Sequence, residues 1–295
     1  MKFGLLGARL GHSLSPQIHA ALYKILNLEA TYDLIEVPAE DLVARVKLLR
    51  QNYKGLNVTI PHKIAVMQCL DEISPEARAI GAVNTIYMQD GHTLGYNTDY
   101  FGFGRLLEHN KLDPAGKTVI VLGTGGASRA VLQYLTDKGV HHLIVITRAI
   151  ESAPADLRDS FAGPLTPKVQ AYADKMHVKG NQSGRLVLRS MCTYKELPHL
   201  HADLLVNCTP IGMFPKTGIS PVPAEVVTNC GAVVDVIYNP AETELLRLAK
   251  AQGKQAVNGL FMLVAQAVAA EEIWLGRKLD NKVIARIMEQ VAQLL

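Results

Sequence analysis

Short apolar runs alternate with longer stretches of helical spacing in the first third of the chain, and this pattern predicts strands separated by helices. Strands are expected at residues 2–6, 31–37, 56–59 and 82–88. Helices are expected at residues 15–26 and 39–49, and from Lys63 onward. Ser15 is expected to cap the first helix ahead of Pro16, and residues 89–91 to form a hairpin turn. The alternation predicts an α/β domain whose largely parallel sheet is covered on both faces.

A second series of strands and helices follows a helix expected from Thr98 to about Leu107, where one domain is expected to give way to another. The apolar run at residues 118–122 is typical of a buried parallel strand. Further strands are expected at residues 142–146, 186–188, 204–207 and 232–236, and helices at residues 242–251, 260–274 and 281–294. Gly253 is expected to end the first of these helices. The segment 149–184, rich in proline and glycine, predicts either a surface excursion or an extra helix near residues 168–176.

Length and composition narrow the class of protein. A chain of 295 residues suits two domains, and its 48% hydrophobic and 19% charged residues are those of an ordinary soluble globular protein. The net charge is only +3 and the basic residues are scattered, which argues against nucleic acid or a membrane surface as a principal partner. No apolar run reaches the roughly 20 residues of a membrane-spanning helix, and no signal peptide is expected.

The four cysteines lack the spacing of a metal finger or a redox motif. Reduced thiols in a reducing, cytoplasmic compartment are therefore expected. The adjacent His141 and His142, and the pair His199 and His201, have no cysteine or carboxylate pattern nearby that would complete a metal site, so no metal is expected. No feature of the sequence sets the oligomeric state, and a homodimer is an open alternative.

A glycine-rich loop follows the strand at residues 118–122 and opens a helix, and this context favours a dinucleotide-binding site. The loop runs Gly123, Thr124, Gly125, Gly126, Ala127. Gly123 permits a tight turn, and Gly125 lets the backbone approach a pyrophosphate that sits on the amides of the helix amino terminus. Ser128 replaces the third glycine of the usual fingerprint, so a plain strand-to-helix turn is the alternative.

The end of the next strand bears on the choice of cofactor. NAD sites usually carry an acidic residue there, which accepts a hydrogen bond from the ribose 2′-hydroxyl. This chain has Thr147 and Arg148 instead. Because an arginine pairs with a 2′-phosphate and a threonine can donate to it, NADP is favoured over NAD. The alternative is that Arg148 is an ordinary surface arginine.

Polar groups gather at residues 55–63, which contain Asn57, Thr59 and Lys63. An ammonium at the end of a strand, beside two uncharged hydrogen-bonding side chains, suits a small hydroxylated substrate, and such a group can move a proton. Taken alone, Lys63 is more typical of a solvated surface lysine.

Other polar side chains stand at predicted strand ends or helix starts. Ser13 and Ser15 lie at a helix amino terminus that can bind a carboxylate. Asn84 supplies an amide and Asp99 a carboxylate at a helix start. Met213 follows a strand in the second half, where it offers an apolar side chain to a nicotinamide ring.

Together these clusters resemble the shikimate dehydrogenase family, which includes the quinate/shikimate dehydrogenases, over almost the whole chain. The matching stretches lie at residues 11–16, 57–63, 81–85, 97–99, 123–127, 209–213, 235–240 and 258–267. Many short motifs in this order identify the family more specifically than any one of them. The resemblance implies an N-terminal α/β substrate domain at residues 1–101, joined by C-terminal helices at about 260–295, and a Rossmann-like NAD(P)-binding domain at residues 102–259.

The same resemblance implies roles for individual residues. Lys63 and Asp99 would form the catalytic pair. The substrate carboxylate would be bound by Ser13 and Ser15, and the ring hydroxyls or the carboxylate by Thr59, Asn84, Tyr238 and Gln266. Residues 123–127 would hold the cofactor pyrophosphate, Thr147 and Arg148 the adenosine phosphate, and Met213 and Gly259 the nicotinamide side.

The implied reaction is the reversible NADPH-dependent reduction of 3-dehydroshikimate to shikimate, on the way to chorismate and the aromatic amino acids. Lys63 would give a proton to the carbonyl oxygen, and Asp99 would orient it.

Two departures keep alternatives open. Thr147 and Arg148 stand where members that use NADP commonly read Asn-Arg-Thr, and the segment that follows is longer than in compact members. In its length, this segment is similar to that of the quinate/shikimate branch, whose members can use NAD. A catalytically silent shikimate-binding regulator is a further alternative, against which the intact Lys63 and Asp99 argue. The two serines, Ser13 and Ser15, favour shikimate over quinate by family analogy.

Overall fold

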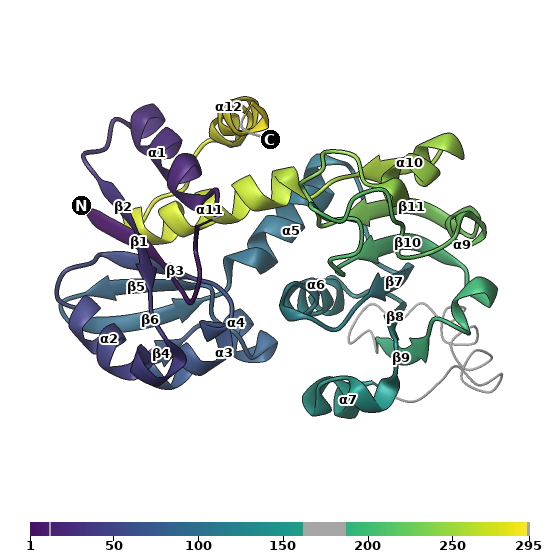
Figure 1. Cartoon of the computed structure of the whole chain (residues 1–295), viewed down its shortest axis with the longest axis horizontal. Coiled ribbons are helices and arrows are strands. Elements are labelled where there is room, and N and C mark those ends of the chain that lie inside the picture. Colours follow the sequence, from purple (N-terminus) through teal and green to yellow (C-terminus); the bar gives the residue numbers. More distant parts are fainter. Residues whose placement is uncertain (12, 162–186, 294–295) are drawn as a thin grey trace. The chain divides into compact units, whose positions relative to one another are not determined.

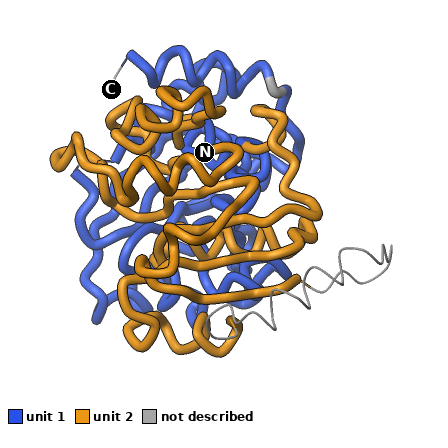
Figure 2. The backbone as a smooth tube through the Cα atoms, turned by 90° about the vertical axis from the view of Figure 1, so that its right-hand side faces the viewer, with its two compact units in different colours: residues 1–106, 261–295 blue, residues 107–260 orange. Residues whose placement is uncertain are grey.

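The computed structural model describes residues 1–11, 13–161 and 187–293 (Figure 1). The chain divides into two compact units, which are Met1–Leu106 with Phe261–Leu295 (unit 1) and Leu107–Leu260 (unit 2) (Figure 2). The extra helix expected near residues 168–176 lies outside the described residues. Within the described part of the chain, no helix combines the length and the apolar character needed to cross a membrane.

Unit 1 is built on a six-stranded sheet with the order β2-β1-β3-β5-β6-β4. Its strands are β1 (Lys2–Gly7), β2 (Thr31–Glu36), β3 (Gly55–Val58), β4 (Glu72–Ile73), β5 (Thr85–Gln89) and β6 (His92–Tyr96). The strands β1, β2 and β3 run parallel, but β5 is antiparallel to both β3 and β6. The sheet is therefore largely parallel, as expected, and β5 is the exception. The expected hairpin turn, at Asp90 and Gly91 with φ of 51° and 78°, leads from β5 back to β6.

The helices that connect these strands are α1 (Ser15–Leu26), α2 (Leu42–Leu49), α3 (His62–Ala65) and α4 (Pro75–Ile80), with 3-10 turns at Ala39–Asp41 and Val66–Cys69. Two expectations at helix starts are wrong. Leu14, not Ser15, holds the N-cap position of α1, because the Leu14 backbone oxygen accepts the first helical hydrogen bond, from the Ile18 N–H at 3.0 Å. The helix expected from residue 39 becomes an α-helix only at Leu42, after the 3-10 turn.

The chain leaves unit 1 within α5 (Thr98–His109) and returns with α11 (Leu260–Leu275) and α12 (Asn281–Ala292), which lies beside α1 (Figure 1). Trp274 anchors α11 to the sheet. Its buried ring stacks on Phe3 with the centroids 4.7 Å apart, and its Nε1 donates to the backbone oxygen of Ile86 at 2.9 Å. Gly55 makes room for the ring, since a Cβ there would overlap the indole. The implied return of a C-terminal helix to the first unit is confirmed.

The described part of unit 2 contains six parallel strands in the order β12-β11-β10-β7-β8-β9. They are β7 (Thr118–Leu122), β8 (His142–Thr147), β9 (Leu188–Thr193), β10 (Ala202–Asn207), β11 (Cys230–Asp235) and β12 (Gln255–Val257). The strand β9 was expected at residues 186–188. It instead runs to Thr193 because all six of its residues pair in register with β8, which supports polar positions such as Arg189 and Ser190.

The helices and 3-10 turns of unit 2 are α6 (Gly126–Asp137), α7 (Ala155–Ser160), α9 (Ala224–Thr228) and α10 (Glu244–Ala251), with Ile150–Ser152 and Leu197–His199. The chain adds β8 and β9 on one side of β7 and then β10, β11 and β12 on the other. This reversal of strand order beside β7 is the point at which doubly wound sheets bind nucleotides. Thr243 caps α10 by accepting from the Leu246 backbone N–H, and Gly253 follows the helix at φ 68°, as expected.

Candidate active site

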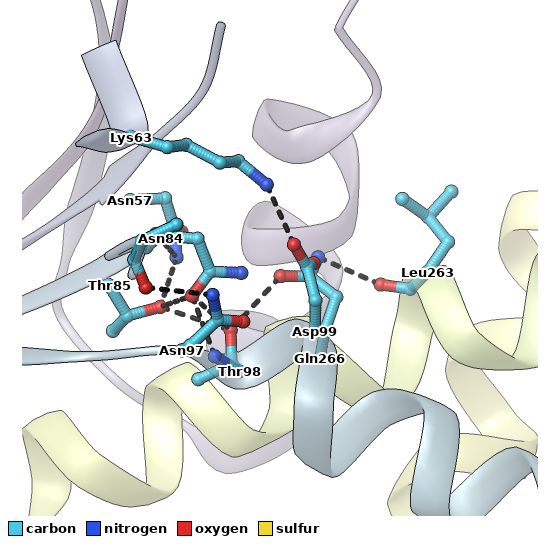
Figure 3. Close-up of polar contacts among 10 residues, drawn as sticks. Asn57, Lys63, Asn84, Thr85, Asn97, Thr98, Asp99, Leu263 and Gln266 are labelled. Carbon is cyan, nitrogen blue, oxygen red and sulfur yellow. Dashed lines mark hydrogen bonds and ion pairs between the residues drawn. The ribbon is translucent and has the colours of Figure 1, made fainter. Parts of the chain in front are cut away.

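Lys63 and Asp99 form an ion pair in unit 1, in which Lys63 Nζ donates to Asp99 Oδ2 at 2.7 Å (Figure 3). Lys63 follows β3 on α3, and Asp99 follows β6 in the first turn of α5. Since β3 and β6 both run antiparallel to β5, their carboxyl ends lie at the same edge of the sheet. The two side chains are 22% and 17% exposed, so the pair is sheltered and still open to a small molecule.

Hydrogen bonds to segments distant in sequence hold the turn that carries Lys63. The buried ring of His62 hydrogen-bonds through Nε2 with the backbone oxygen of Val37 at 2.8 Å. The backbone oxygen of Lys63 accepts from the Val83 N–H at 2.8 Å. His62 was not among the predicted site residues, and its place next to Lys63 was the only signal in the sequence that could have found it.

Asn84 presents an oriented amide beside the ion pair. Its Oδ1 accepts from the Thr98 backbone N–H at 2.6 Å and from the hydroxyls of Thr85 and Thr98 at 3.0 and 3.1 Å. These contacts fix the carboxamide, and Figure 3 shows its nitrogen turned toward the side where Lys63 and Asp99 meet. Asn84 therefore offers N–H donors to a ligand oxygen at this place.

Gln266 comes to the same place from α11. Its Oε1 accepts from the Thr98 hydroxyl at 3.3 Å, and its Nε2 donates to the backbone oxygen of Leu263 at 2.9 Å (Figure 3). Gly102 on α5 permits this approach, since a Cβ there would lie 2.8 Å from the backbone oxygen of Met262. A residue far along the chain thus stands beside Asp99, as the resemblance implied.

Ser13, Ser15 and Thr59 are all half-buried and follow neighbouring strands of the same sheet. The two serines come after β1 and Thr59 comes directly after β3, and these strands are parallel. The Thr59 backbone N–H donates to the Leu6 oxygen at 2.9 Å, and Gly7 lacks the Cβ that would lie 2.7 Å from the Thr59 methyl group. The structure therefore brings the three hydroxyls to one edge of the unit 1 sheet.

The glycine-rich loop of unit 2 has the geometry of a phosphate cradle. Gly123 has φ 95°, and a Cβ on it would lie 2.9 Å from the Thr209 methyl group of the loop after β10. Cβ atoms on Gly125 and Gly126 would meet no atom within 4 Å, so the backbone at the start of α6 faces open space. The unpaired amides of a helix amino terminus attract an anion, and the loop therefore fits a dinucleotide pyrophosphate.

The other predicted cofactor residues follow the carboxyl ends of the parallel strands of this sheet. Thr147 ends β8 as a buried residue, and Arg148 follows it with an exposed side chain. Met213, 44% exposed, lies in the loop after β10, and Gly259 follows β12. Together with the glycine-rich loop after β7, they stand along one edge of the sheet.

Tyr238, predicted to bind substrate, belongs to unit 2, whereas the other predicted substrate residues belong to unit 1. It follows β11, is half-buried, and has a pKa raised by burial. Among the residues that the structure describes, no three histidine, cysteine, aspartate or glutamate side chains are placed to hold a metal ion.

A buried aspartate organises the loops at this edge of unit 2. Asp235 Oδ1 accepts from Asn207 Nδ2 at 3.0 Å and from the Ile237 N–H at 3.1 Å, and Oδ2 accepts from the Thr243 hydroxyl at 2.7 Å. Asn207 Oδ1 in turn accepts from the backbone and hydroxyl of Thr209 at 3.0 and 2.7 Å. Asp235 and Asn207 were not among the predicted site residues, although a lone acid at the end of an apolar strand was a visible signal.

The stability of unit 2 is expected to depend on the ionisation of Asp235. Burial raises its pKa from 3.8 to about 6, against the hydrogen bonds from Thr243, Ile237 and Asn207 that lower it. The folded state therefore holds this proton more tightly, so the stabilisation is complete below pH 3.8 and is lost as the pH rises through 6. The unfolding free energy contributed by this group should fall by about 3 kcal/mol over that window.

Urea unfolding of the protein and of Asp235→Asn, measured in parallel across this pH range, isolates that contribution. The asparagine does not titrate, so the difference between the two unfolding free energies should fall as the pH rises. A difference that stays constant with pH would show that Asp235 keeps an ordinary pKa in the folded protein.

Comparisons with known proteins agree on one family. A model described as the shikimate dehydrogenase substrate binding domain matches residues 5–86. A relative from Clostridium beijerinckii, named shikimate dehydrogenase (NADP(+)), is 41% identical over 283 residues, which cover 95% of this chain and 94% of the relative.

Two solved structures are similar over almost their whole length. One is a chorismate mutase/shikimate 5-dehydrogenase fusion protein from Clostridium acetobutylicum, 40% identical with a TM-score of 0.84, covering 99% of this chain and 97% of that chain. The other, from Thermus thermophilus, is a shikimate 5-dehydrogenase in complex with NADP(H) and shikimate, 33% identical with a TM-score of 0.78, covering 98% of this chain and 99% of that chain. By these similarities in sequence and structure, the chain belongs to the shikimate dehydrogenase family.

Proposed function

We propose that this protein is an NADP-dependent oxidoreductase that interconverts shikimate and 3-dehydroshikimate. The observation that carries the proposal is the sheltered ion pair between Lys63 and Asp99, with the amide of Asn84 turned toward it. Lys63 can carry a proton, Asp99 orients Lys63, and Asn84 offers a hydrogen-bond donor to a ring hydroxyl. The Clostridium relatives and the Thermus structure supply the substrate and the cofactor by name.

In the proposed mechanism, Lys63 works at the oxygen of the reacting carbon. In reduction its ammonium gives a proton to the carbonyl oxygen, and in oxidation the neutral amine takes that proton back. Asp99 orients the Lys63 Nζ through the 2.7 Å contact and accepts from a neighbouring ring hydroxyl. NADPH, when bound, supplies the hydride that reduces the carbonyl carbon.

We assign the remaining unit 1 residues to substrate recognition. Ser13 and Ser15 bind the carboxylate, for which two hydroxyls and a helix amino terminus suit a small anion. Asn84 and Gln266 hold ring hydroxyls, and Thr59 adds a hydroxyl at the same sheet edge. Residues 1–101 with about 260–295 are thus proposed as the substrate-binding domain, and residues 102–259 as the dinucleotide-binding domain. Tyr238 of unit 2 is assigned to the substrate by family resemblance alone.

We assign the edge of unit 2 to NADP. The amides of Gly123, Thr124, Gly125, Gly126 and Ala127 hold the pyrophosphate. Thr147 and Arg148 bind the 2′-phosphate, and Met213 and Gly259 line the nicotinamide side. None of the four cysteines is joined in a disulfide, which supports the proposal that the protein works in the reducing environment of the cytoplasm.

The absorbance of the reduced nicotinamide tests the function directly. Purified protein is mixed with shikimate or quinate and with NADP⁺ or NAD⁺, and the proposal expects the fastest reduction with shikimate and NADP⁺. Faster turnover with quinate and NAD⁺ would instead favour the quinate/shikimate branch. No reduction in any of the four mixtures, with shikimate binding retained, would identify a catalytically silent relative.

Arg148→Ala is expected to raise the KM for NADP⁺ by about 10- to 100-fold, because a charge-assisted hydrogen bond to phosphate contributes roughly 1.5–3 kcal/mol. The KM for shikimate should stay unchanged, and any slow reaction with NAD⁺ should not weaken. Arg45→Ala, which removes an exposed arginine from unit 1, is the matched control. An unchanged KM for NADP⁺ would make Arg148 an ordinary surface arginine.

A further inference from the structure

The hydroxyl of Tyr32 hydrogen-bonds to Asn57, which in turn contacts the polar side chains of the proposed site. Tyr32 lies on β2, and its hydroxyl donates to Asn57 Oδ1 at 2.7 Å. Asn57 is only 6% exposed, and its carboxamide nitrogen donates to the Thr85 hydroxyl at 3.1 Å and to the Asn84 backbone oxygen at 3.4 Å. Both ends of the Asn57 amide are therefore held by the protein, and Tyr32 supplies the hydrogen bond to its oxygen.

Hydrogen bonds connect Asn57 to Asn84, whose amide nitrogen faces Lys63 and Asp99. The Thr85 hydroxyl, which accepts from Asn57, donates to Asn84 Oδ1 at 3.0 Å. This is one of the contacts that turn the Asn84 nitrogen toward the ion pair (Figure 3). A directed chain of hydrogen bonds thus runs from Tyr32 through Asn57 and Thr85 to Asn84.

The phenol of Tyr32 keeps its proton near neutral pH, because burial raises its pKa well above the ordinary value. The hydroxyl therefore stays a donor to Asn57 Oδ1.

A buried stack holds the Tyr32 ring in this place. The ring of His19 on α1 lies parallel to it, with the centroids 4.1 Å apart and an interplanar angle of 9°. His19 Nδ1 contacts Glu271 Oε1 on α11 at 2.6 Å, and both side chains are at most 1% exposed. His19 of α1, itself held by Glu271 of α11, therefore restrains the Tyr32 ring and keeps its hydroxyl near Asn57.

We propose that Tyr32 is a positioning residue for the substrate site, which orients the amide of Asn57 and, through Thr85, the amide of Asn84. This inference rests on the proposed function, because its effect is read as recognition of shikimate. Tyr32 does not touch the reacting atoms. It presets the donors that a ring hydroxyl meets, so that the substrate does not have to order them.

Tyr32→Phe tests the inference, since it keeps the ring on His19 and removes only the hydroxyl. The KM for shikimate should rise about 3- to 10-fold, the effect of one hydrogen bond, while the KM for NADP⁺ is unchanged. Tyr53→Phe is the matched control. Its hydroxyl donates to Asp33 Oδ2 at 2.6 Å in the same unit, away from the Asn57 amide, so both Michaelis constants should stay as in the parent protein. A purely structural role for Tyr32 would lower the active fraction, and with it kcat, but leave both constants unchanged.

A double-mutant cycle asks whether Tyr32 acts through Asn57. In the Asn57→Ala background, Tyr32→Phe should have little further effect on the KM for shikimate, because the hydrogen bond is already gone. Fully additive effects, or equal shikimate constants in Tyr32→Phe and the parent protein, would overturn the inference. If Asn57→Ala does not fold, the comparison of Tyr32→Phe with Tyr53→Phe decides alone. A parent protein without turnover on shikimate would refute the proposed function, and this inference with it.

Discussion

Lys63→Ala is expected to lower kcat for shikimate oxidation by about 10²- to 10⁴-fold, the range that a positioned general acid or base contributes. The reason is the place of its ammonium, 2.7 Å from Asp99 and in a sheltered position at the edge of the unit 1 sheet. Cofactor affinity should stay within error, because the glycine-rich loop and Arg148 belong to unit 2. Steady-state kinetics and calorimetric titration with NADP⁺ measure the two quantities separately.

Two further variants show what the lysine does. Lys47→Ala removes an exposed lysine from α2 of the same unit and should leave kcat unchanged. Lys63→Arg keeps the positive charge, but a guanidinium does not give up its proton near neutral pH. If Lys63 moves the proton, Lys63→Arg should be as slow as Lys63→Ala. Recovery of most of the rate in Lys63→Arg would mean that Lys63 acts by its charge, and full activity in Lys63→Ala would refute the assignment.

Gly259→Ala is expected to lower the unfolding free energy of unit 2 by about 3 kcal/mol, at the upper end of what overpacking costs. A Cβ on Gly259 would overlap the carbonyl group of Val236, which is backbone and cannot turn aside. The Gly259 N–H also donates to the Ile237 oxygen at 2.9 Å, so relief of the overlap would break this contact. Because these loops carry the proposed nicotinamide side of the site, NADP⁺ binding should weaken as well.

Gly253→Ala is the matched control, since a Cβ at that position meets no atom within 4 Å. Its φ of 68° alone should cost about 1–2 kcal/mol. Denaturant unfolding of the two variants and titration with NADP⁺ provide the comparison. If Gly259→Ala were as stable as Gly253→Ala and bound NADP⁺ normally, the loop after β12 would be looser than the structure indicates.

The sequence predicted those features that depend on residues adjacent in the chain. The apolar run before Gly123 and the helix after it predicted the dinucleotide loop, and both its φ of 95° and the open space around Gly125 agree with that reading. The hairpin at Asp90 and Gly91 was readable for the same reason, because a tight turn depends on a few adjacent residues.

Contacts between distant segments were not readable, because they are set by packing. The strand β9 was expected to be short, yet pairing with β8 extends it over residues without an apolar pattern. The buried Asp235 and its partner Asn207 are 28 residues apart, and only the adjacent parallel strands β10 and β11 bring them together.

The sequence by itself determined the family, the α/β class, the phosphate loop and the identity of the lysine and the carboxylate proposed for catalysis. These depend on motifs whose residues are neighbours in the chain. Only the tertiary structure decided that Lys63 and Asp99 are paired, which way the Asn84 amide points, and that Tyr32, clamped by His19, stands behind the site. Orientation of this kind arises from hydrogen bonds and packing between segments far apart in sequence, and no local pattern encodes it.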